Sequence, residues 1–105
     1  MDISLEQLDE AVPFSFHIGI RFISASAGEV RAKLELSDKV GNFAGMMHGG
    51  AIMTLADTAG STCAFLNLPP NTVTTTTDSN TRFLRPISSG VAIATARPLR
   101  VGRTS

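Results

Sequence analysis

The chain has 105 residues, of which 43% are apolar and 17% are charged, and its formal net charge is zero. This length and composition predict one globular domain over residues 1–105 and exclude a disordered chain. The charge balance gives no reason to expect nucleic acid or a membrane as a partner. The single cysteine excludes an intrachain disulfide, and the acidic start lacks a secretion-signal pattern, so we expect a cytoplasmic protein.

The first third of the chain predicts a helix followed by a hairpin. Apolar residues at helical spacing predict an amphipathic helix over residues 3–12, which ends at Pro13. Residues 20–27 are predicted as a strand, and a turn follows. Over residues 29–36 apolar and charged side chains alternate strictly, which is typical of a half-buried strand. These two strands are expected to form an antiparallel hairpin.

The rest of the chain predicts one long helix and more strands. Residues 37–47 contain three loop-favouring residues, Gly41, Asn42 and Gly45, and are expected to form a loop. Residues 50–66 are predicted to form the long helix. Threonine-rich residues 72–84 and apolar residues 91–101 are predicted strands. The order of elements favours an α+β fold.

The long helix carries a single acidic residue, Asp57. Between Val40 and Thr77 the ionisable side chains apart from Cys63 are His48 and Asp57. At 100° per residue, one apolar stripe contains Ala51, Ile52, Leu55, Ala56, Ala59, Thr62, Cys63 and Leu66. Asp57 lies on the other face, which has no Lys, Arg or Glu. We therefore expect a second subunit or a ligand to cover that face, with Asp57 in an interface cleft.

A glycine pair opens the helix. His48-Gly49-Gly50 brings backbone amides and the positive end of the helix dipole to one place. Such amides can stabilise a developing oxyanion, and glycine lets a ligand approach closely. The alternative interpretation is that the glycines only permit a tight turn into the helix.

A combination of motifs points to a known family. It consists of Asn42, the His48-Gly49-Gly50 run, Asp57 nine residues after the histidine, and Arg85-Pro86 after the next strand. This combination resembles the PaaI-type acyl-CoA thioesterases of the hotdog superfamily, and the resemblance covers essentially the whole chain. It implies the hotdog fold, an antiparallel sheet wrapped around one long central helix. The chain ends before the family's last strands, so we expect a C-terminally incomplete domain.

The resemblance also implies how the protein assembles and what it binds. Members form a homodimer or homotetramer with active sites at the dimer interface. They use no metal and no bound cofactor, because coenzyme A arrives as part of the acyl-CoA substrate.

The resemblance assigns catalytic roles to five residues. Asp57 is the catalytic carboxylate, acting as general base or as nucleophile, and the Gly49 amide polarises the thioester carbonyl. Asn42 and His48 shape the thioester end of the pocket, and Thr76 orients water. Each residue also has a structural alternative. Asp57 could be bonded to a partner group across an interface, and Gly49 could only permit a turn. Asn42 and His48 could only order the loop, and Thr76 could be a plain strand residue.

A second set of residues is expected to bind the substrate. Arginine matches phosphate geometry well, so the C-terminal arginines are candidates for the phosphates of coenzyme A, although a solvated surface explains them too. The predicted binding set is Gly50, Met47, Arg82, Arg85, Arg100 and Arg103.

The predicted function is hydrolysis of a small or medium acyl- or aryl-CoA to the free acid and coenzyme A. A non-catalytic acyl-CoA-binding or sensing domain is the main alternative, and a structural fragment that hydrolyses nothing is another. A hotdog hydratase is disfavoured, because no histidine follows Asp57. The natural acyl group and the carrier thiol stay open.

Overall fold

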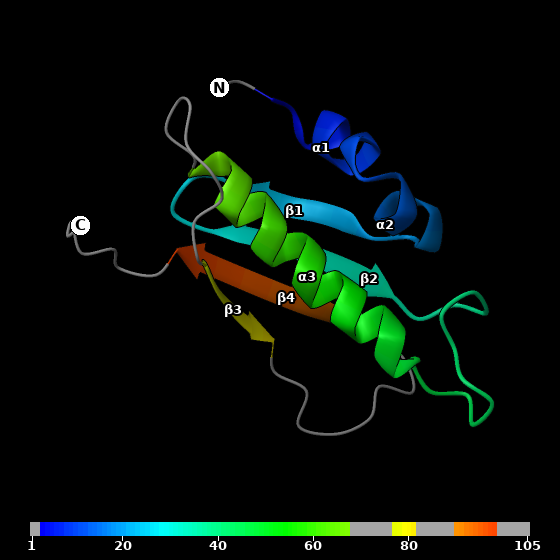
Figure 1. Ribbon diagram of the computed structural model, residues 1–105. Coiled ribbons are helices and arrows are strands. Elements are labelled where there is room, and N and C mark those ends of the chain that lie inside the picture. The colour runs from blue at the N-terminus through cyan, green and yellow to red at the C-terminus, as the bar shows by residue number, and fades with distance from the viewer. Residues whose placement is uncertain (1–2, 68–76, 82–89, 99–105) are drawn as a thin grey trace.

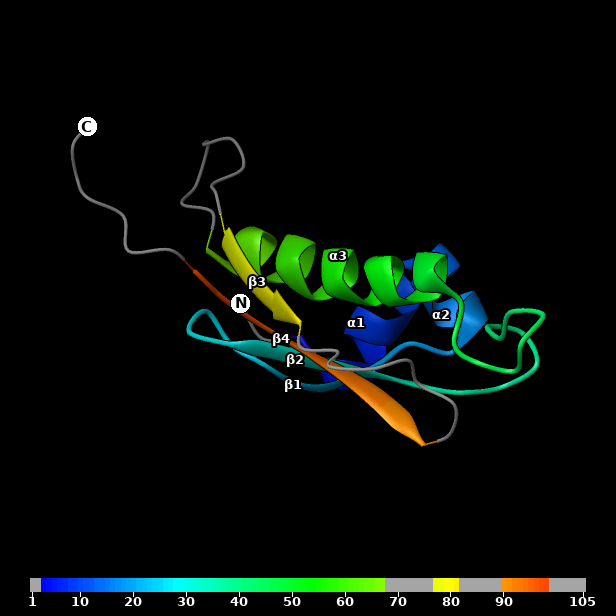
Figure 2. The same cartoon turned by 90° about the horizontal axis from the view of Figure 1, so that it is seen from below.

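A computed structural model describes residues 3–67, 77–81 and 90–98, and shows helices along one side of a four-stranded sheet (Figure 1, Figure 2). The predicted α+β class is therefore confirmed. In chain order the elements are α1 (Leu5–Ala11), α2 (Pro13–Ile18), β1 (Arg21–Ala25), β2 (Val30–Glu35), α3 (Gly49–Leu66), β3 (Thr77–Thr81) and β4 (Val91–Pro98).

The strands lie in the order β1-β2-β4-β3, and every neighbouring pair is antiparallel. The predicted hairpin of β1 and β2 is confirmed. The last described strand, β4, lies between β2 and β3, so β1 and β3 form the edges of the described sheet. In the predicted strands 72–84 and 91–101, the residues beyond β3 and β4 lie outside the described residues.

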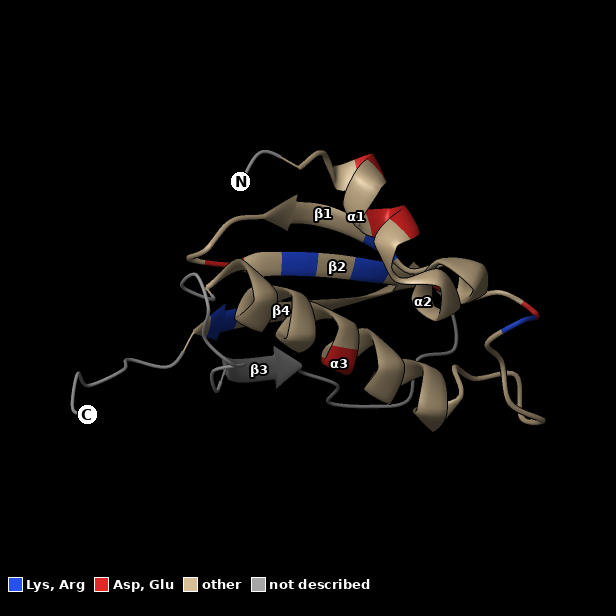
Figure 3. Cartoon of the chain, turned by 45° about the horizontal axis from the view of Figure 1, so that its top comes forward, with Lys and Arg blue, Asp and Glu red and all other residues tan. Residues whose placement is uncertain are grey.

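The core lies between the sheet and α3. Alternate residues of β2 and β4 face it and are at most 2% exposed: Val30, Ala32, Leu34, Ala92, Ala94 and Ala96. The alanines of β4 leave room for α3, which places Ala59 and Cys63 in the core with no exposed surface. Small side chains on both elements let α3 run close along the sheet (Figure 1). Charged residues of β2 alternate with the buried ones (Figure 3).

The first helix covers an edge of the sheet. It begins with a capping box, in which Ser4 Oγ accepts from the Gln7 amide and Gln7 Oε1 accepts from the Ser4 amide. At the sheet, Asp9 Oδ1 accepts a 2.8 Å hydrogen bond from the Phe22 amide of β1. A carboxylate thus partners a backbone group of the edge strand.

The second helix was not predicted from the sequence. Pro13 ends the first helical run, as expected, but it also opens α2, because proline is well suited to the first turn of a helix. The short helix ends at Gly19, whose φ of 105° suits glycine. A bend of this kind places α2 beside α3 rather than along the path of α1 (Figure 1).

The faces of α3 follow the predicted division in part, because Gly60 and Ala64, which helical spacing places on the face of Asp57, are buried. The predicted stripe is buried or half-buried, with Leu55 fully buried. On the opposite face Met53 is 68% exposed and Phe65 is 48% exposed, and Asp57 and Ser61 are exposed between them. Asp57 is the acidic residue that marks α3 in Figure 3. A single chain thus leaves an apolar helix face open around one carboxylate.

Candidate active site

The start of α3 is organised by His48. Its Nδ1 accepts a 2.8 Å hydrogen bond from the Gly50 amide, so the imidazole caps the helix. With Nδ1 used as an acceptor, the proton of the neutral ring resides on Nε2, which can donate to a ligand. The predicted loop-ordering role of His48 is therefore visible, and it leaves a donor for the predicted role at the thioester.

Asn42 is arranged in the same way. Its Oδ1 accepts from the amides of Ala44 and Met46, at 2.8 and 3.1 Å, and so holds the loop before α3. The two N–H bonds of its side-chain amide have no acceptor within the described part of the chain. Asn42 and His48 thus use their acceptor atoms to bind the loop and helix backbone. The side-chain N–H groups of Asn42 and the Nε2–H of His48 stay available to donate to a ligand.

The two glycines have different surroundings. A Cβ on Gly50 would lie 3.0 Å from His48 Nδ1 and 3.2 Å from Cε1, so the capping ring itself requires glycine there. A Cβ on Gly49 would meet nothing within 4 Å. Gly49 is the first residue of α3, and its amide has no intrahelical acceptor. The described residues give no steric reason for glycine at position 49, which favours the interpretation that a ligand approaches there.

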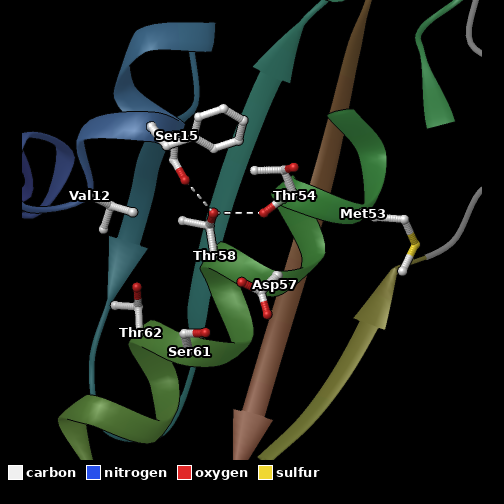
Figure 4. Close-up of a pocket in the computed structure, with 9 residues that line it drawn as sticks. Val12, Ser15, Met53, Thr54, Asp57, Thr58, Ser61 and Thr62 are labelled. Atoms are coloured by element: carbon white, nitrogen blue, oxygen red, sulfur yellow. Dashed lines mark hydrogen bonds between the residues drawn. The ribbon is translucent and has the colours of Figure 1, made fainter. Parts of the chain in front are cut away.

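Asp57 lines a groove of about 550 Å³ between α2 and α3. Val12 and Phe14 line it from the α2 side, and Met53, Ser61 and Thr62 line it with Asp57 from α3 (Figure 4). A second groove of about 350 Å³ shares part of its lining with the first. His48, Gly50 and Lys39 line this second groove, and Phe14 and Thr54 line both.

A buried pair of hydroxyls joins the two helices that form the groove. Ser15 Oγ on α2 and Thr58 Oγ1 on α3 are 2.7 Å apart, and both residues are at most 4% exposed. Thr58 Oγ1 also donates to the Thr54 carbonyl at 2.7 Å (Figure 4). Since Thr58 has one hydroxyl proton, Ser15 is the donor of the pair. This hydrogen bond holds α2 against α3 next to Asp57.

The donors and the carboxylate lie far apart along α3. Gly49 and Asp57 are separated by eight residues, which is about 12 Å along the helix axis. Asp57 lines one groove, and His48 and Gly50 line the other. The chain therefore does not bring its carboxylate and its donor cluster around one atom.

Several predicted site residues are placed elsewhere or lie outside the described residues. Met47, predicted to bind substrate, is 4% exposed and packs in the core, and it lines neither groove. The remaining predictions, which no described residue tests, concern Thr76, Arg82, Arg85, Arg100 and Arg103.

The sequence interpretation missed several residues that line the grooves. Ser61 follows Asp57 by one turn on the same exposed face, and Lys39 lines the second groove. Helical spacing from Asp57 could have identified Ser61. Ser15 could not have been identified, because its place in the groove depends on how α2 packs against α3.

Cys63 is the one thiol of the chain and is fully buried in the core, as predicted. Burial raises the pKa of its thiol, which keeps it protonated and unreactive. In the described part of the chain, no group of three His, Cys, Asp or Glu side chains is placed to hold a metal ion. Among the described helices, none is both long and apolar enough to cross a membrane.

Three known proteins illustrate what the chain is similar to. Proofreading thioesterase EntH of Klebsiella pneumoniae is 34% identical over 89 residues, which are 85% of this chain and 65% of EntH. The 1,4-dihydroxy-2-naphthoyl-CoA hydrolase of Listeria monocytogenes is 30% identical over 84% of this chain and 72% of its own length. The crystal structure of thioesterase HI1161 of Haemophilus influenzae superposes with a TM-score of 0.78 at 29% identity, covering 98% of this chain and 73% of that one.

The sequence profile of the Thioesterase superfamily matches residues 44–105, which is more than half of the chain. The matched segment contains Gly49 at the start of α3, Asp57, which lines the first groove, and His48, which lines the second. This match, the relatives and the shared architecture agree with one another. The chain belongs to the thioesterase superfamily and has its hotdog fold.

Proposed function

We propose that this protein is an acyl-CoA thioesterase whose active site is completed by a second copy of the chain. The family and the similarity to a CoA thioester hydrolase support thioester hydrolysis. The observation that carries the composite site is the separation of about 12 Å between Gly49 and Asp57 along α3. Catalytic groups must lie within hydrogen-bond reach of the reacting atoms, so one chain cannot supply both ends.

The exposed face of α3 supports the same proposal. Met53, Asp57, Ser61 and Phe65 recur every four residues and are all exposed in the single chain. A symmetric dimer uses the same patch on both copies and creates two equivalent sites. Each site then combines Asp57 of one protomer with Gly49, His48 and Asn42 of the other, in a dimer or a tetramer built from such dimers.

The chemistry follows from these groups. The Gly49 amide, with His48 Nε2–H and the Asn42 side-chain amide, donates to the thioester oxygen, where negative charge develops. Asp57 takes a proton from water while the water oxygen attacks the carbonyl carbon, and the C–S bond of the tetrahedral intermediate then breaks. The proton on Asp57 passes to the leaving sulfur, which restores the carboxylate, and the products are the free acid and coenzyme A. As a nucleophile, Asp57 would instead form an anhydride that water hydrolyses.

The rest of the site is proposed in the same terms. The arginines at positions 82, 85, 100 and 103 remain candidates for the phosphates of coenzyme A, Thr76 for a water-orienting hydroxyl, and Gly50, which lines the second groove, for substrate binding. The proposed reaction needs no resident cofactor, because coenzyme A enters and leaves as part of substrate and product.

Subunit mixing tests the composite site. Asp57→Asn removes the carboxylate, and Gly49→Val blocks the amide, so each variant alone is expected to be inactive on a panel of acyl-CoAs. When the two are unfolded together in equal amounts and refolded, about one quarter of the composite sites contain both intact ends in a randomly mixed symmetric oligomer. Activity near a quarter of wild type is therefore expected.

Two outcomes would contradict the proposal. If mixed oligomers form, as shown by mass spectrometry, and no activity returns, each chain must hold both ends of its own site. If the wild-type protein binds coenzyme A but hydrolyses no acyl-CoA of the panel, the protein is an acyl-CoA-binding domain and the catalytic proposal is wrong.

A further inference from the structure

Thr62 has a buried hydroxyl with no hydrogen-bond partner among the described residues. The residue is only 6% exposed and lies on α3. Its hydroxyl makes no hydrogen bond to any described residue. A buried hydroxyl without a hydrogen bond costs free energy, and such groups in folded proteins call for an explanation.

The neighbouring threonines show what Thr62 does not do. Thr54 Oγ1 donates to the Gly50 carbonyl at 2.8 Å, and Thr58 Oγ1 donates to the Thr54 carbonyl at 2.7 Å. Each uses the carbonyl four residues earlier, as threonine in a helix can. The corresponding acceptor for Thr62 is the Thr58 carbonyl, and that hydrogen bond is not made. The hydroxyl of Thr62 therefore stays available to a ligand as donor and acceptor.

Thr62 is also positioned where a bound ligand could reach its hydroxyl. It lines the groove between α2 and α3 together with Asp57, and it lies on the side of α3 that faces Val12 (Figure 4). Val12, Phe14 and Met53 give this groove apolar surface beside the hydroxyl. Apolar walls with a few well-placed polar groups are typical of small-molecule sites.

We propose that the groove between α2 and α3 holds the acyl group and that Thr62 recognises a hydrogen-bonding substituent on it. The inference rests on the proposed thioesterase function and adds a specificity-determining residue to it. Thr62 follows Asp57 by five residues, about 7.5 Å along the helix axis and roughly the reach of an extended six-carbon chain. The preferred substrate class therefore carries a hydroxyl or carbonyl at that distance from the thioester.

A matched pair of substrates tests the proposal. Hexanoyl-CoA and 6-hydroxyhexanoyl-CoA differ by one hydroxyl at the required distance. The wild-type protein is expected to have the higher kcat/KM for 6-hydroxyhexanoyl-CoA. Thr62→Val keeps the side-chain shape without the hydroxyl, and should lower the ratio of the two kcat/KM values about 3- to 10-fold, the contribution of one neutral hydrogen bond. The change should appear in KM, because Thr62 contacts a part of the substrate that does not react.

Two further variants control for the side-chain change itself. Thr62→Ser keeps the hydroxyl and is expected to keep the wild-type ratio. Thr54→Val removes a hydroxyl from the same helix and groove, but one already bonded to the Gly50 carbonyl, and should leave the ratio unchanged. An unchanged ratio in Thr62→Val, or an equal loss in Thr54→Val, would overturn the proposal.

Binding separates this inference from the proposed reaction. Thioether analogues of the two substrates cannot be hydrolysed, and calorimetry gives their Kd values even if the protein hydrolyses no thioester. Thr62→Val should weaken only the hydroxylated analogue, by the same 3- to 10-fold. Equal weakening of both analogues, or no binding of either to the wild-type protein, would overturn the proposal.

Thermal stability adds a readout without ligand. Because the hydroxyl of Thr62 is buried and makes no hydrogen bond within the described part of the chain, Thr62→Val should leave the Tm of the free protein unchanged or raise it. Thr58→Val removes an acceptor that Ser15 uses and should lower the Tm. A lower Tm in Thr62→Val would show that the hydroxyl already has a partner, and would overturn the proposal.

Discussion

Replacing Gly49 by alanine should stabilise the protein while reducing its activity. In the chain, a Cβ at position 49 meets no heavy atom within 4 Å, and Gly49 already lies in α3. Alanine loses less backbone entropy than glycine on entering a helix, so the free energy of unfolding should rise by about 0.5 kcal/mol, and by at most about 1 kcal/mol. For a domain of this size 0.5 kcal/mol corresponds to roughly 2–4 °C in Tm.

Gly50→Ala is the matched control, because it makes the same change one residue later. There the new Cβ would lie 3.0 Å from His48 Nδ1, so the imidazole has to move. The hydrogen bond from the Gly50 amide to His48 is then strained or lost, which costs about 1 kcal/mol for a helix cap. The gain in helix propensity is offset, and Gly50→Ala should be less stable than Gly49→Ala by about 1 kcal/mol.

The assay combines unfolding with hydrolysis. Urea midpoints are compared at one fixed protein concentration, since oligomers unfold in a concentration-dependent way. If the Gly49 amide contacts the thioester, a methyl group at position 49 obstructs the approach of the substrate. The resulting weaker oxyanion contact should lower kcat/KM at least about tenfold. A stable Gly49→Ala protein with wild-type kcat/KM would refute the oxyanion role of Gly49.

Further predictions concern the helix cap, the interhelical contact, the core and pH. His48→Asn should keep the cap to the Gly50 amide and the Tm within roughly 3 °C, yet reduce kcat, since asparagine lacks the imidazole Nε2–H; equal kcat would leave His48 with a structural role only. In a double-mutant cycle, Ser15→Ala and Thr58→Val should show a coupling of about 1 kcal/mol in urea unfolding, and additive effects would contradict the hydrogen bond between them. Leu34→Ala, at a fully buried position, should cost about 2–5 kcal/mol in the same assay, and a loss under 1 kcal/mol would contradict its place in the core. Burial raises the pKa of the Cys63 thiol above its value in the unfolded chain, so the folded state holds this proton more tightly. The contribution of Cys63 to the free energy of unfolding is therefore fully present below the unfolded pKa and is lost as the pH rises through the alkaline range. Cys63→Ala should flatten this decline in stability between pH 8 and 10, about the range in which free thiols ionise.

The sequence determined the elements whose side-chain pattern is long and regular. Strict alternation predicted β2, and the run over residues 50–66 with one apolar stripe predicted α3 to within one residue and the outward direction of Asp57. The glycine pair and Asp57 marked the two ends of the candidate site for the same reason: a helix start and a lone carboxylate are local signals. The resemblance to the thioesterase family rests on these residues and their spacing, and the comparisons confirm the family.

Only the tertiary structure decided what lies beside these elements. Nothing in the local pattern shows that β4 inserts between β2 and β3, because strand order depends on contacts between residues far apart in the sequence. The six residues of α2 are too few for a clear helical period, so the wall that places Ser15 against Thr58 was not foreseen. Thr62 belongs to the predicted buried stripe, yet packing places it at a groove, where its hydroxyl has no partner in residues 3–67, 77–81 and 90–98. Local sequence sets which residues can face inward, whereas the packing of distant segments sets which of them find a partner.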